Sequence, residues 1–398
     1  MTVRVNVAAL HFYLRLELSM KALVVSVVIF CGIAVCGGQE TAITPQVVSS
    51  TDVKDKTVSG PFSNEELLQF TSLNPIDTHT HVFVSNPAFG AMLKRLNLHL
   101  LDIVLVDDQN PHLKDLFAES TAARRFVHGS EGRAALCTTF DPYRLNERGF
   151  TEASIRAVDQ EFNQGAIAVK IWKNIGMEIK DSSGRYILPD NPLFEPIYKD
   201  IDFHGKTLIA HVADPSSSWS PENPASPDYS YYKEHPVWYM FNKSHPASRE
   251  EILQARDHIL EEHPNLRVVG AHLGSMEADF GQLSQHLDRY PNFAVDLAGR
   301  MPYLMLQPPA GVIAFIVKYQ DRLIYATDND LSPNDDIQQK IGEWEESYAR
   351  DWRFLATDDT LDYRGKAVKG LALPNSILRK LFHDNATRWF PGILREFR

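Results

Sequence analysis

Five side chains of the kinds that bind metals each end or directly follow a short apolar run in this chain of 398 residues. They are His79, His81, His211, His272 and Asp328. Residues at the carboxyl ends of parallel strands gather at one mouth of a β/α barrel, so these side chains are expected to converge. Imidazole and carboxylate groups together suit a divalent ion such as zinc. The pattern therefore predicts a hydrolytic metal site.

The spacing of His79 and His81 fits a strand. Residues two apart on a strand project to the same face, so both imidazoles would point into the barrel. The pair alone is weak evidence, because 15 histidines in 398 residues give about 0.6 such pairs by chance. The prediction depends on the whole set of strand ends.

Apolar runs alternate with stretches of helical spacing along the chain, which is typical of a parallel β/α fold. The predicted strands are residues 76–83, 101–106, 134–140, 167–172, 207–211, 267–272, 293–296 and 323–327. Eight such units predict the α/β class and a closed (β/α)8 TIM barrel. A hydrophobic content of 44% is ample for its core.

Three segments add detail to this barrel. Residues 248–263 form the clearest helix, because Ser248 and Glu251 make a capping box at its start. Residues 214–246 are rich in proline, serine and aromatics and follow the strand that bears His211. We expect them to form a long loop insertion after strand 5 that serves as a lid or substrate wall. Extra C-terminal helices are expected at 337–355 and 376–382.

The charge balance disfavours a nucleic-acid partner. Forty basic residues against 51 acidic ones leave a net charge of −11, and no long basic run is present. A small-molecule substrate is the expected partner, and the oligomeric state stays open.

The N-terminal region has the pattern of an export signal. Residues 22–35 are apolar but too short to span a bilayer, which takes about 20 residues. Residues 1–38 are therefore predicted to be a signal peptide or lipoprotein leader. Cys36 resembles a lipid-acceptor cysteine, although Val35 departs from the small residue expected before it. The protein is expected to be exported and either periplasmic or lipid-anchored to the cell envelope through Cys36.

The rest of the chain divides at a change in composition. Residues 39–65 are predicted to be a polar linker, because they lack sustained periodicity. Folding is expected to begin near Leu67, and residues 66–392 to form the barrel with its C-terminal helices.

The motifs together resemble the amidohydrolase superfamily, in the amidohydrolase-related branch that includes aminocarboxymuconate semialdehyde decarboxylase. The resemblance covers roughly residues 75–391. It rests on Asp77 with His79 and His81, on His211, on His272 with Gly274, and on Thr327 with Asp328.

This resemblance implies that His79, His81, His211 and Asp328 hold one divalent metal, most often zinc, with His272 beside it. It implies a catalytic role for Asp328, which would accept a proton from a metal-activated water and pass it to the leaving group. His272 would hydrogen-bond or protonate the developing oxyanion. Asp77 is interpreted as a structural group that supports the ligands.

Four further residues stand where they could line the site. Lys170 ends the fourth strand, where related enzymes carry a carboxylated lysine that bridges a second metal; an unmodified lysine that contacts substrate or a carboxylate is the alternative. Arg300 could clamp a substrate carboxylate in a bidentate manner. Lys173 and Trp172 are predicted to bind substrate, although ion pairing and simple packing would also explain such residues.

The leading hypothesis is an enzyme, a metal-dependent hydrolase acting on a C–N, C–O or lactone bond of a small, carboxylated or neutral substrate. A metal-dependent nonoxidative decarboxylase of the same family is the first alternative. A noncatalytic ligand-binding lipoprotein is the second, since fold does not fix function. The intact ligand set argues against this last alternative.

Overall fold

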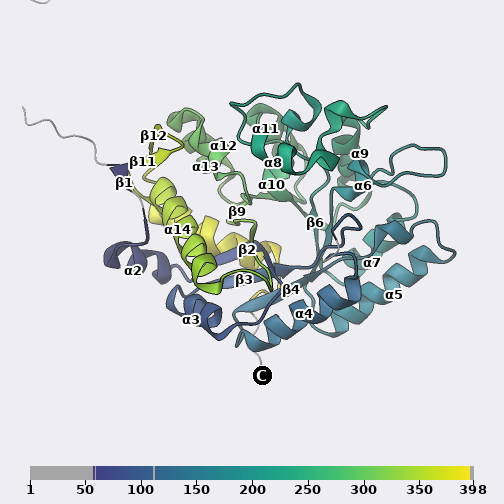
Figure 1. Ribbon diagram of the computed structural model, residues 1–398, viewed down its shortest axis with the longest axis horizontal. Helices are drawn as coiled ribbons and strands as arrows, with labels where there is room; N and C mark the ends of the chain where they lie inside the picture. The colour runs from purple at the N-terminus through teal and green to yellow at the C-terminus, as the bar shows by residue number, and fades with distance from the viewer. Residues whose placement is uncertain (1–56, 59, 111–112, 395–398) are drawn as a thin grey trace, which may run out of the picture. The chain divides into compact units, whose positions relative to one another are not determined.

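A computed structural model of the protein describes residues 57–58, 60–110 and 113–394. Within these residues, parallel strands at the centre are surrounded by helices (Figure 1). The barrel strands are β2 (Ile76–Val82), β3 (His99–Ile103), β4 (Ala134–Thr138), β5 (Ala168–Ile171), β6 (Thr207–Ala210), β7 (Arg267–Gly270), β8 (Phe293–Asp296), β9 (Leu323–Ile324) and β10 (Asn329–Leu331). Seven of the eight predicted strands are present as continuous strands, and the predicted TIM-barrel class is confirmed.

The eighth strand is the one that departs from the prediction. It is split into β9, which pairs with β8, and β10, which pairs with β2. The segment between them still closes the barrel, because Thr78 N donates to Tyr325 O at 3.2 Å and Asp328 N donates to His79 O at 2.9 Å. Asp328 has a left-handed φ of 70°, which interrupts the extended ladder. The prediction of one continuous strand over 323–327 is therefore wrong.

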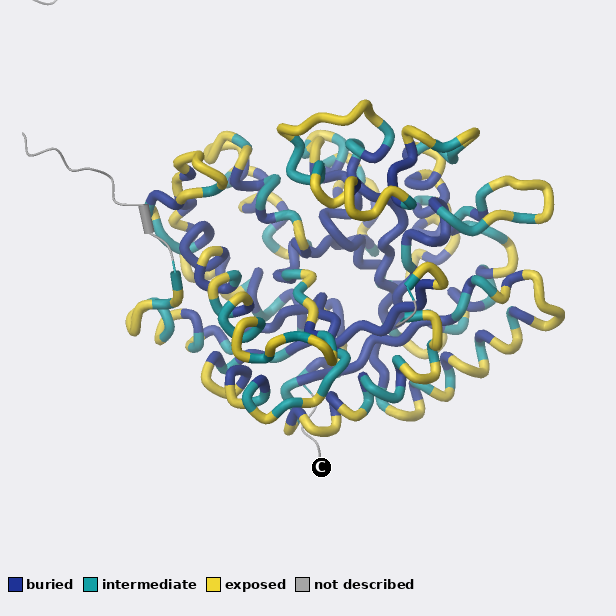
Figure 2. The backbone as a smooth tube through the Cα atoms, in the orientation of Figure 1, coloured by how far each residue is buried: buried dark blue, intermediate teal, exposed yellow. Residues whose placement is uncertain are grey.

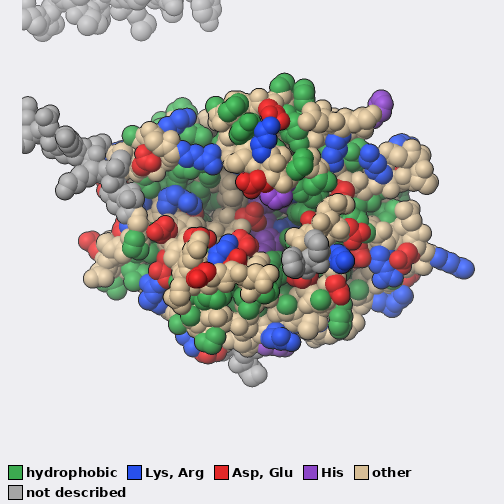
Figure 3. All heavy atoms as spheres, viewed as in Figure 1, with side chains coloured by type: hydrophobic (Ala, Val, Ile, Leu, Met, Phe, Trp, Pro, Cys, Tyr) green, Lys and Arg blue, Asp and Glu red, His purple; other side chains and the backbone are tan. Residues whose placement is uncertain are grey.

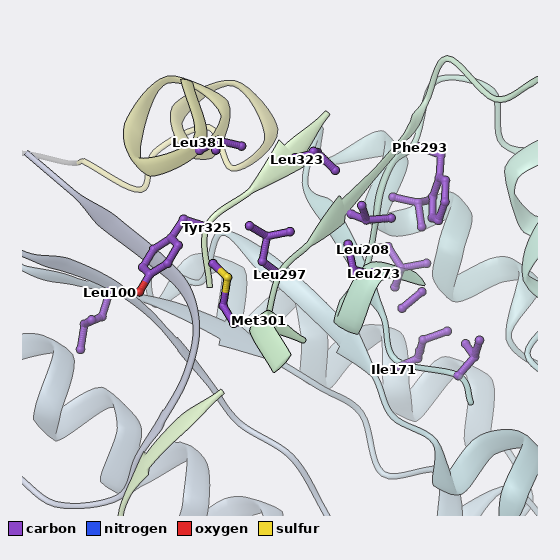
Figure 4. Close-up of a cluster of buried hydrophobic side chains, with 14 of the residues drawn as sticks. Leu100, Ile171, Leu208, Leu273, Phe293, Leu297, Met301, Leu323, Tyr325 and Leu381 are labelled. Carbon is purple, nitrogen blue, oxygen red and sulfur yellow. The ribbon is translucent and has the colours of Figure 1, made fainter. Parts of the chain in front are cut away.

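Side chains on the barrel strands alternate between two buried layers. Leu101 and Ile103 pack inside the barrel, whereas Leu100 belongs to the layer between strands and helices. Figure 4 shows part of that outer layer, including Leu208 and Phe293. The pairing of β2 with β3 shifts register between residues 77 and 80, which changes the face of the sheet toward which the following side chains of β2 point.

The remaining elements cover the barrel and its ends. The helices that follow or flank the strands are α2 (Asn64–Ser72), α3 (Pro87–Arg95), α4 (Leu116–Gly129), α5 (Phe150–Asn163), α6 (Asn174–Met177), α7 (Glu195–Phe203), α9 (Arg249–Glu262), α10 (Ala271–Gly274), α11 (Phe280–Arg289), α12 (Met301–Met305), α13 (Pro309–Tyr319) and α14 (Ile337–Ala356), with the 3-10 turn η2 (Pro142–Arg144). Figure 2 shows buried backbone concentrated at the centre and exposed backbone on the outer turns. The capping box of Ser248 and Glu251 is present at the start of α9, as predicted.

The insertion after the fifth strand contains short helical segments. They are η3 (Ser216–Trp219), α8 (Tyr229–Glu234), η4 (Pro236–Trp238) and η5 (Met240–Asn242). We call residues 214–246 the lid. Its aromatic residues are partly buried, with Trp238 and Tyr239 both in the core.

The C-terminal helices have two placements. The predicted helix over 337–355 is α14, which packs against α3 outside the barrel. The predicted helix over 376–382 is divided into α15 (Asn375–Arg379) and the π-helical turn η6 (Lys380–Asp384), followed by α16 (Asn385–Trp389). Trp389 and Phe390 pack with the residues inside the barrel. They close the barrel at the amino-terminal ends of its strands, opposite the mouth that carries the metal-type residues.

The chain is folded before Leu67. Helix α2 begins at Asn64 with a capping box from Ser63, and Arg353 of α14 donates to Glu66 at 2.6 and 2.9 Å. A small sheet joins β1 (Thr57–Val58), β11 (Thr360–Tyr363) and β12 (Lys366–Lys369). The predicted leader and Cys36 lie outside the described residues. Among the helices that the structure describes, none has the length and apolar character needed to cross a membrane.

Candidate metal centre

Three of the predicted ligands meet at the mouth of the barrel. His79, His81 and Asp328 each offer an atom within 4.8 Å of the other two. Oδ1 of Asp328 lies 3.4 Å from Nε2 of His79 and 3.5 Å from Nε2 of His81. Two ligand atoms that are each about 2.1 Å from a tetrahedral ion are themselves about 3.4 Å apart. The spacing of these three ligand atoms therefore suits a single divalent ion.

Hydrogen bonds orient both imidazoles for this purpose. Nδ1 of His79 donates to Oδ2 of Asp296 at 2.9 Å, and Nδ1 of His81 donates to the carbonyl of Ile103 at 2.8 Å. In each neutral ring the proton is then on Nδ1 and the lone pair on Nε2 faces Asp328. Such outer contacts fix the tautomer of metal-binding histidines.

His272 and His211 continue this row of rings. The ring centroids of His79 and His272 are 4.9 Å apart, and those of His272 and His211 are 4.2 Å apart. The structure does not bring His211 into the group of His79, His81 and Asp328. Its Nε2 has no hydrogen-bond partner among the described residues, so it carries an unused ligand atom.

The backbone around His272 is unusual. His272 and Leu273 have φ values of 58° and 55°, in the left-handed region that costs non-glycine residues energy. Gly270 makes this turn feasible, because a Cβ there would lie 2.7 Å from the ring of Phe293 and 2.8 Å from the Cα of Gly274. His272 N donates to Asp296 at 2.7 Å, which stabilises the turn.

The pKa shifts of Asp328, His211 and His272 favour the protonation states that bind metal ions. Burial acts to raise the pKa of Asp328, but His272 and His79 outweigh it and hold the pKa well below its usual range. Burial lowers the pKa of His211 and His272 well below the usual value. At neutral pH Asp328 is therefore an anion, and both imidazoles are neutral.

Lys170 faces into this centre. Its Nζ lies 2.7 Å from Nε2 of His79, and the residue is only 1% exposed. Ala168, two residues earlier on β5, packs inside the barrel, which agrees with this facing. Burial lowers the pKa of Lys170, so the neutral amine forms more readily than it would in water.

Asp77 forms hydrogen bonds that connect the elements around the centre. Its carboxylate accepts from Thr327 Oγ1 at 2.6 Å and from Tyr348 at 2.9 Å, and it also accepts from His79 N at 3.2 Å. Burial raises the pKa of Asp77 to about 7. These contacts connect β2, the end of the eighth strand and α14, and they agree with the structural role expected for Asp77.

Lys173 and Trp172 contact the lid. Nζ of Lys173 donates to both oxygens of Asp214 at 2.8 and 2.9 Å and to Tyr231 at 2.7 Å. An ammonium group has three hydrogens, and these three contacts use them. Trp172 packs edge-on against Trp238, with ring centroids 5.0 Å apart. Both residues therefore contact the lid, and the substrate contacts expected for them stay predictions.

Arg300 is held by a buried carboxylate that sequence reasoning missed. Nε of Arg300 lies 3.7 Å from Oε2 of Glu277, which is fully buried. Neither oxygen of Glu277 has a hydrogen-bond partner within the part of the chain that the structure describes. The Arg300 side chain is 12% exposed, so part of it reaches the solvent while it pairs with Glu277.

Asp296 is the second residue that sequence reasoning missed. It accepts hydrogen bonds from His79 Nδ1, His272 N and Ala298 N. A signal was present, because Asp296 ends the predicted strand 293–296 just as the metal-type residues end theirs. Glu277 gives no such signal, since it lies in a turn five residues after His272.

Figure 3 shows a hollow near the middle of one face, in which histidine and acidic side chains gather. A closed parallel barrel with candidate metal ligands at the carboxyl ends of its strands is the arrangement of a β/α-barrel metalloprotein. The sequence of residues 76–392 matches the family model described as amidohydrolase. The chain therefore belongs to the amidohydrolase family, which confirms the resemblance found in its motifs. Family and site together indicate an enzyme that uses a divalent metal on a small molecule.

Several solved structures resemble the chain at low identity. A 2,6-dihydroxybenzoate decarboxylase from Rhizobium is 14% identical, with 79% of this chain and 98% of that chain covered and a TM-score of 0.43. An amidohydrolase from Burkholderia multivorans is 11% identical, with 79% and 98% covered and a TM-score of 0.43. A 4-oxalomesaconate hydratase from Rhodopseudomonas palustris is 11% identical, with 80% and 95% covered and a TM-score of 0.44. No curated protein matches the chain.

Proposed function

We propose that the protein is a zinc-dependent hydrolase that cleaves a C–N, C–O or lactone bond of a small substrate. The observation that carries the proposal is the convergence of His79, His81 and Asp328 at distances suited to one ion. Asp328 is the most accessible of the three, with a side chain 38% exposed, whereas His79 is fully buried. An exposed carboxylate beside buried imidazoles is suited to proton transfer with a substrate.

A bound divalent ion would supply Lewis acidity and lower the pKa of a coordinated water toward about 7. Asp328 would take up the proton that is released and deliver it to the leaving group. Arg300, oriented by Glu277, would hold a carboxylate of the substrate when one is present.

For His272 the hydrogen bonds support a role other than oxyanion contact. Nδ1 of His272 donates to the carbonyl of Ala298 at 2.8 Å, so Nε2 of the neutral ring carries no proton. Nε2 then accepts from Nδ1 of His211 at 3.2 Å, which leaves the lone pair on Nε2 of His211, an atom that lies 3.6 Å from Oδ1 of Asp214. We assign His272 the task of orienting His211 as the fourth ligand.

The test combines metal binding with turnover. His79→Ala should lose zinc binding and all zinc-dependent activity, whereas His258→Ala, a change at an exposed histidine of α9, should keep both. Zinc-loaded protein would be screened against lactones, amides, esters and aromatic carboxylic acids. Zinc affinity in His79→Ala equal to that of the wild type would refute the proposal.

The same screen separates hydrolysis from decarboxylation. The observation that favours a decarboxylase is Arg300, because a cationic side chain at the mouth suits an acid substrate. Release of carbon dioxide from an aromatic acid, without hydrolysis of any ester, amide or lactone, would replace the proposed reaction by that alternative.

A further inference from the structure

A cavity of about 680 Å³ adjoins the metal centre at His81. It lies between α4 and the segments that follow β2, β3 and β10. Pockets that enclose drug-sized ligands have volumes of roughly 300–1,000 Å³. The space is thus large enough for a substantial part of a substrate.

His81 connects the cavity to the metal centre. Its ring stacks against Phe83 with an interplanar angle of 13° and a centroid distance of 6.3 Å. Both residues line the cavity. The same imidazole has Nε2 3.5 Å from Asp328. A substrate bond placed at the centre therefore has the wall formed by Phe83 as its immediate neighbour.

Six of the twelve residues that line the cavity are apolar, and the polar ones include two carboxylates, Glu119 and Asp330. Leu105, Leu113, Ala118 and Ala122 line it together with Phe83, and Glu119 adds a half-buried carboxylate. Oε2 of Glu119 has no hydrogen-bond partner in the described chain. An anionic group placed here would meet that carboxylate and lose hydration without compensation.

Positive charge lies toward the other end of the row of imidazoles. The described lining of this cavity includes neither lysine nor arginine. Arg300 lies two residues after Ala298, whose carbonyl accepts from Nδ1 of His272 at 2.8 Å, and the cavity begins at His81, on the far side of His79. The two ends of the site therefore differ in charge, because Arg300 lies toward one end and the described lining at the other end includes Glu119 and Asp330 but no basic residue.

We propose that this cavity is a specificity subsite for an uncharged apolar group of the substrate, an acyl chain or an aryl ring attached to the bond that reacts at the metal centre. The inference rests on the proposed metal-dependent function and adds the substrate class. Any carboxylate of the substrate would lie toward Arg300 and away from Glu119.

The probes are n-alkyl hydroxamic acids, from acetohydroxamic to octanohydroxamic acid, titrated calorimetrically into the zinc-loaded protein. The hydroxamate group chelates zinc, and the tail then reports on the cavity. Burial of each methylene should strengthen binding about fourfold until the cavity is filled. Suberic acid monohydroxamate, whose tail ends in a carboxylate, should bind more weakly than octanohydroxamic acid.

Two variants make the test specific. Ala122→Phe adds a ring to the cavity wall and should abolish the gain with tail length while acetohydroxamic acid binds as before. Ala310→Phe makes the same change at an exposed position of α13 and should leave the gain intact. Glu119→Gln should reduce the difference between the suberic and octanoic probes.

The outcomes separate the subsite from the metal centre. Equal affinity for short and long tails, with acetohydroxamic acid bound, would overturn the subsite and leave the metal function standing. Tighter binding of the suberic probe than of the octanoic one would overturn the assigned chemistry. Failure of acetohydroxamic acid itself to bind would overturn the metal centre, and the subsite with it.

Discussion

Replacing Asp296 by asparagine should reverse the tautomer of His79. Oδ1 of Asp296 accepts from the backbone N–H groups of His272 and Ala298 at 2.7 and 3.1 Å, so an asparagine would have to keep its oxygen there. Its amide nitrogen would then face Nδ1 of His79, which now donates to Oδ2 at 2.9 Å. Two donors cannot face each other, so the His79 proton would move to Nε2 and block the ligand atom.

The expected loss of metal affinity follows from that geometry. Removal of a partner behind a metal-binding histidine typically reduces metal affinity 10- to 100-fold, or about 1.4–2.8 kcal/mol. We expect the upper end for Asp296→Asn, because the pair is almost fully buried and the variant favours the wrong tautomer. The nearly unchanged shape of the side chain should preserve the fold.

The assay is competition for zinc with a chelator, together with ¹⁵N NMR shifts of the histidine rings. Asp288→Asn is the matched control, because Asp288 is an exposed partner of Lys318 on the barrel surface and should have no effect on zinc. A zinc affinity of Asp296→Asn within twofold of the wild type would refute the reasoning. An unchanged Nδ1-protonated ring at His79 would refute it independently.

Two further predictions concern stability. Tyr231→Phe removes a hydrogen bond to the buried ammonium of Lys173 and should lower the unfolding free energy by about 1–3 kcal/mol, measured by urea denaturation, with zinc affinity unchanged; a loss below a few tenths would contradict the lid contact. Burial, assisted by the charge of Arg133, lowers the pKa of His99 from 6.5 to about 4. The unfolded chain therefore takes up the proton first, and stability should fall by at most about 3 kcal/mol as pH drops from 6.5 to 4. His99→Gln should lose that part of the pH dependence, and identical pH profiles of variant and wild type would count against it.

The sequence was sufficient for the barrel because each strand is a short apolar run with a polar end. Three residues from two of these runs, His79 and His81 on one and Asp328 after the other, meet within 4.8 Å in the structure. Their convergence follows from the parallel arrangement alone, since all strand ends then lie at one mouth. The convergence of these residues could therefore be predicted without knowledge of any contact between particular side chains.

The residues that sequence reasoning missed or assigned otherwise depend on such contacts. Lys173 is hydrogen-bonded to Asp214 and Tyr231 of the lid, which lie 41 and 58 positions away in the sequence. Glu277 acquires its role only through Arg300, which lies on a different strand end. Neither partnership has a sequence spacing that secondary structure would dictate, so periodicity cannot reveal it.

Backbone strain points to the same few residues as the chemistry does. His272 and Asp328 have φ values of 58° and 70°, and such left-handed conformations of non-glycine residues cost about 1–3 kcal/mol each. Strain of this size persists only where surrounding contacts fix it. His272 N is fixed by Asp296, and Asp328 N by the carbonyl of His79. The contacts that stabilise the strained backbone are thus made by Asp296 and His79, the pair that also sets the ligand tautomer, so the geometry of the centre and the closure of the barrel depend on one shared hydrogen-bond network.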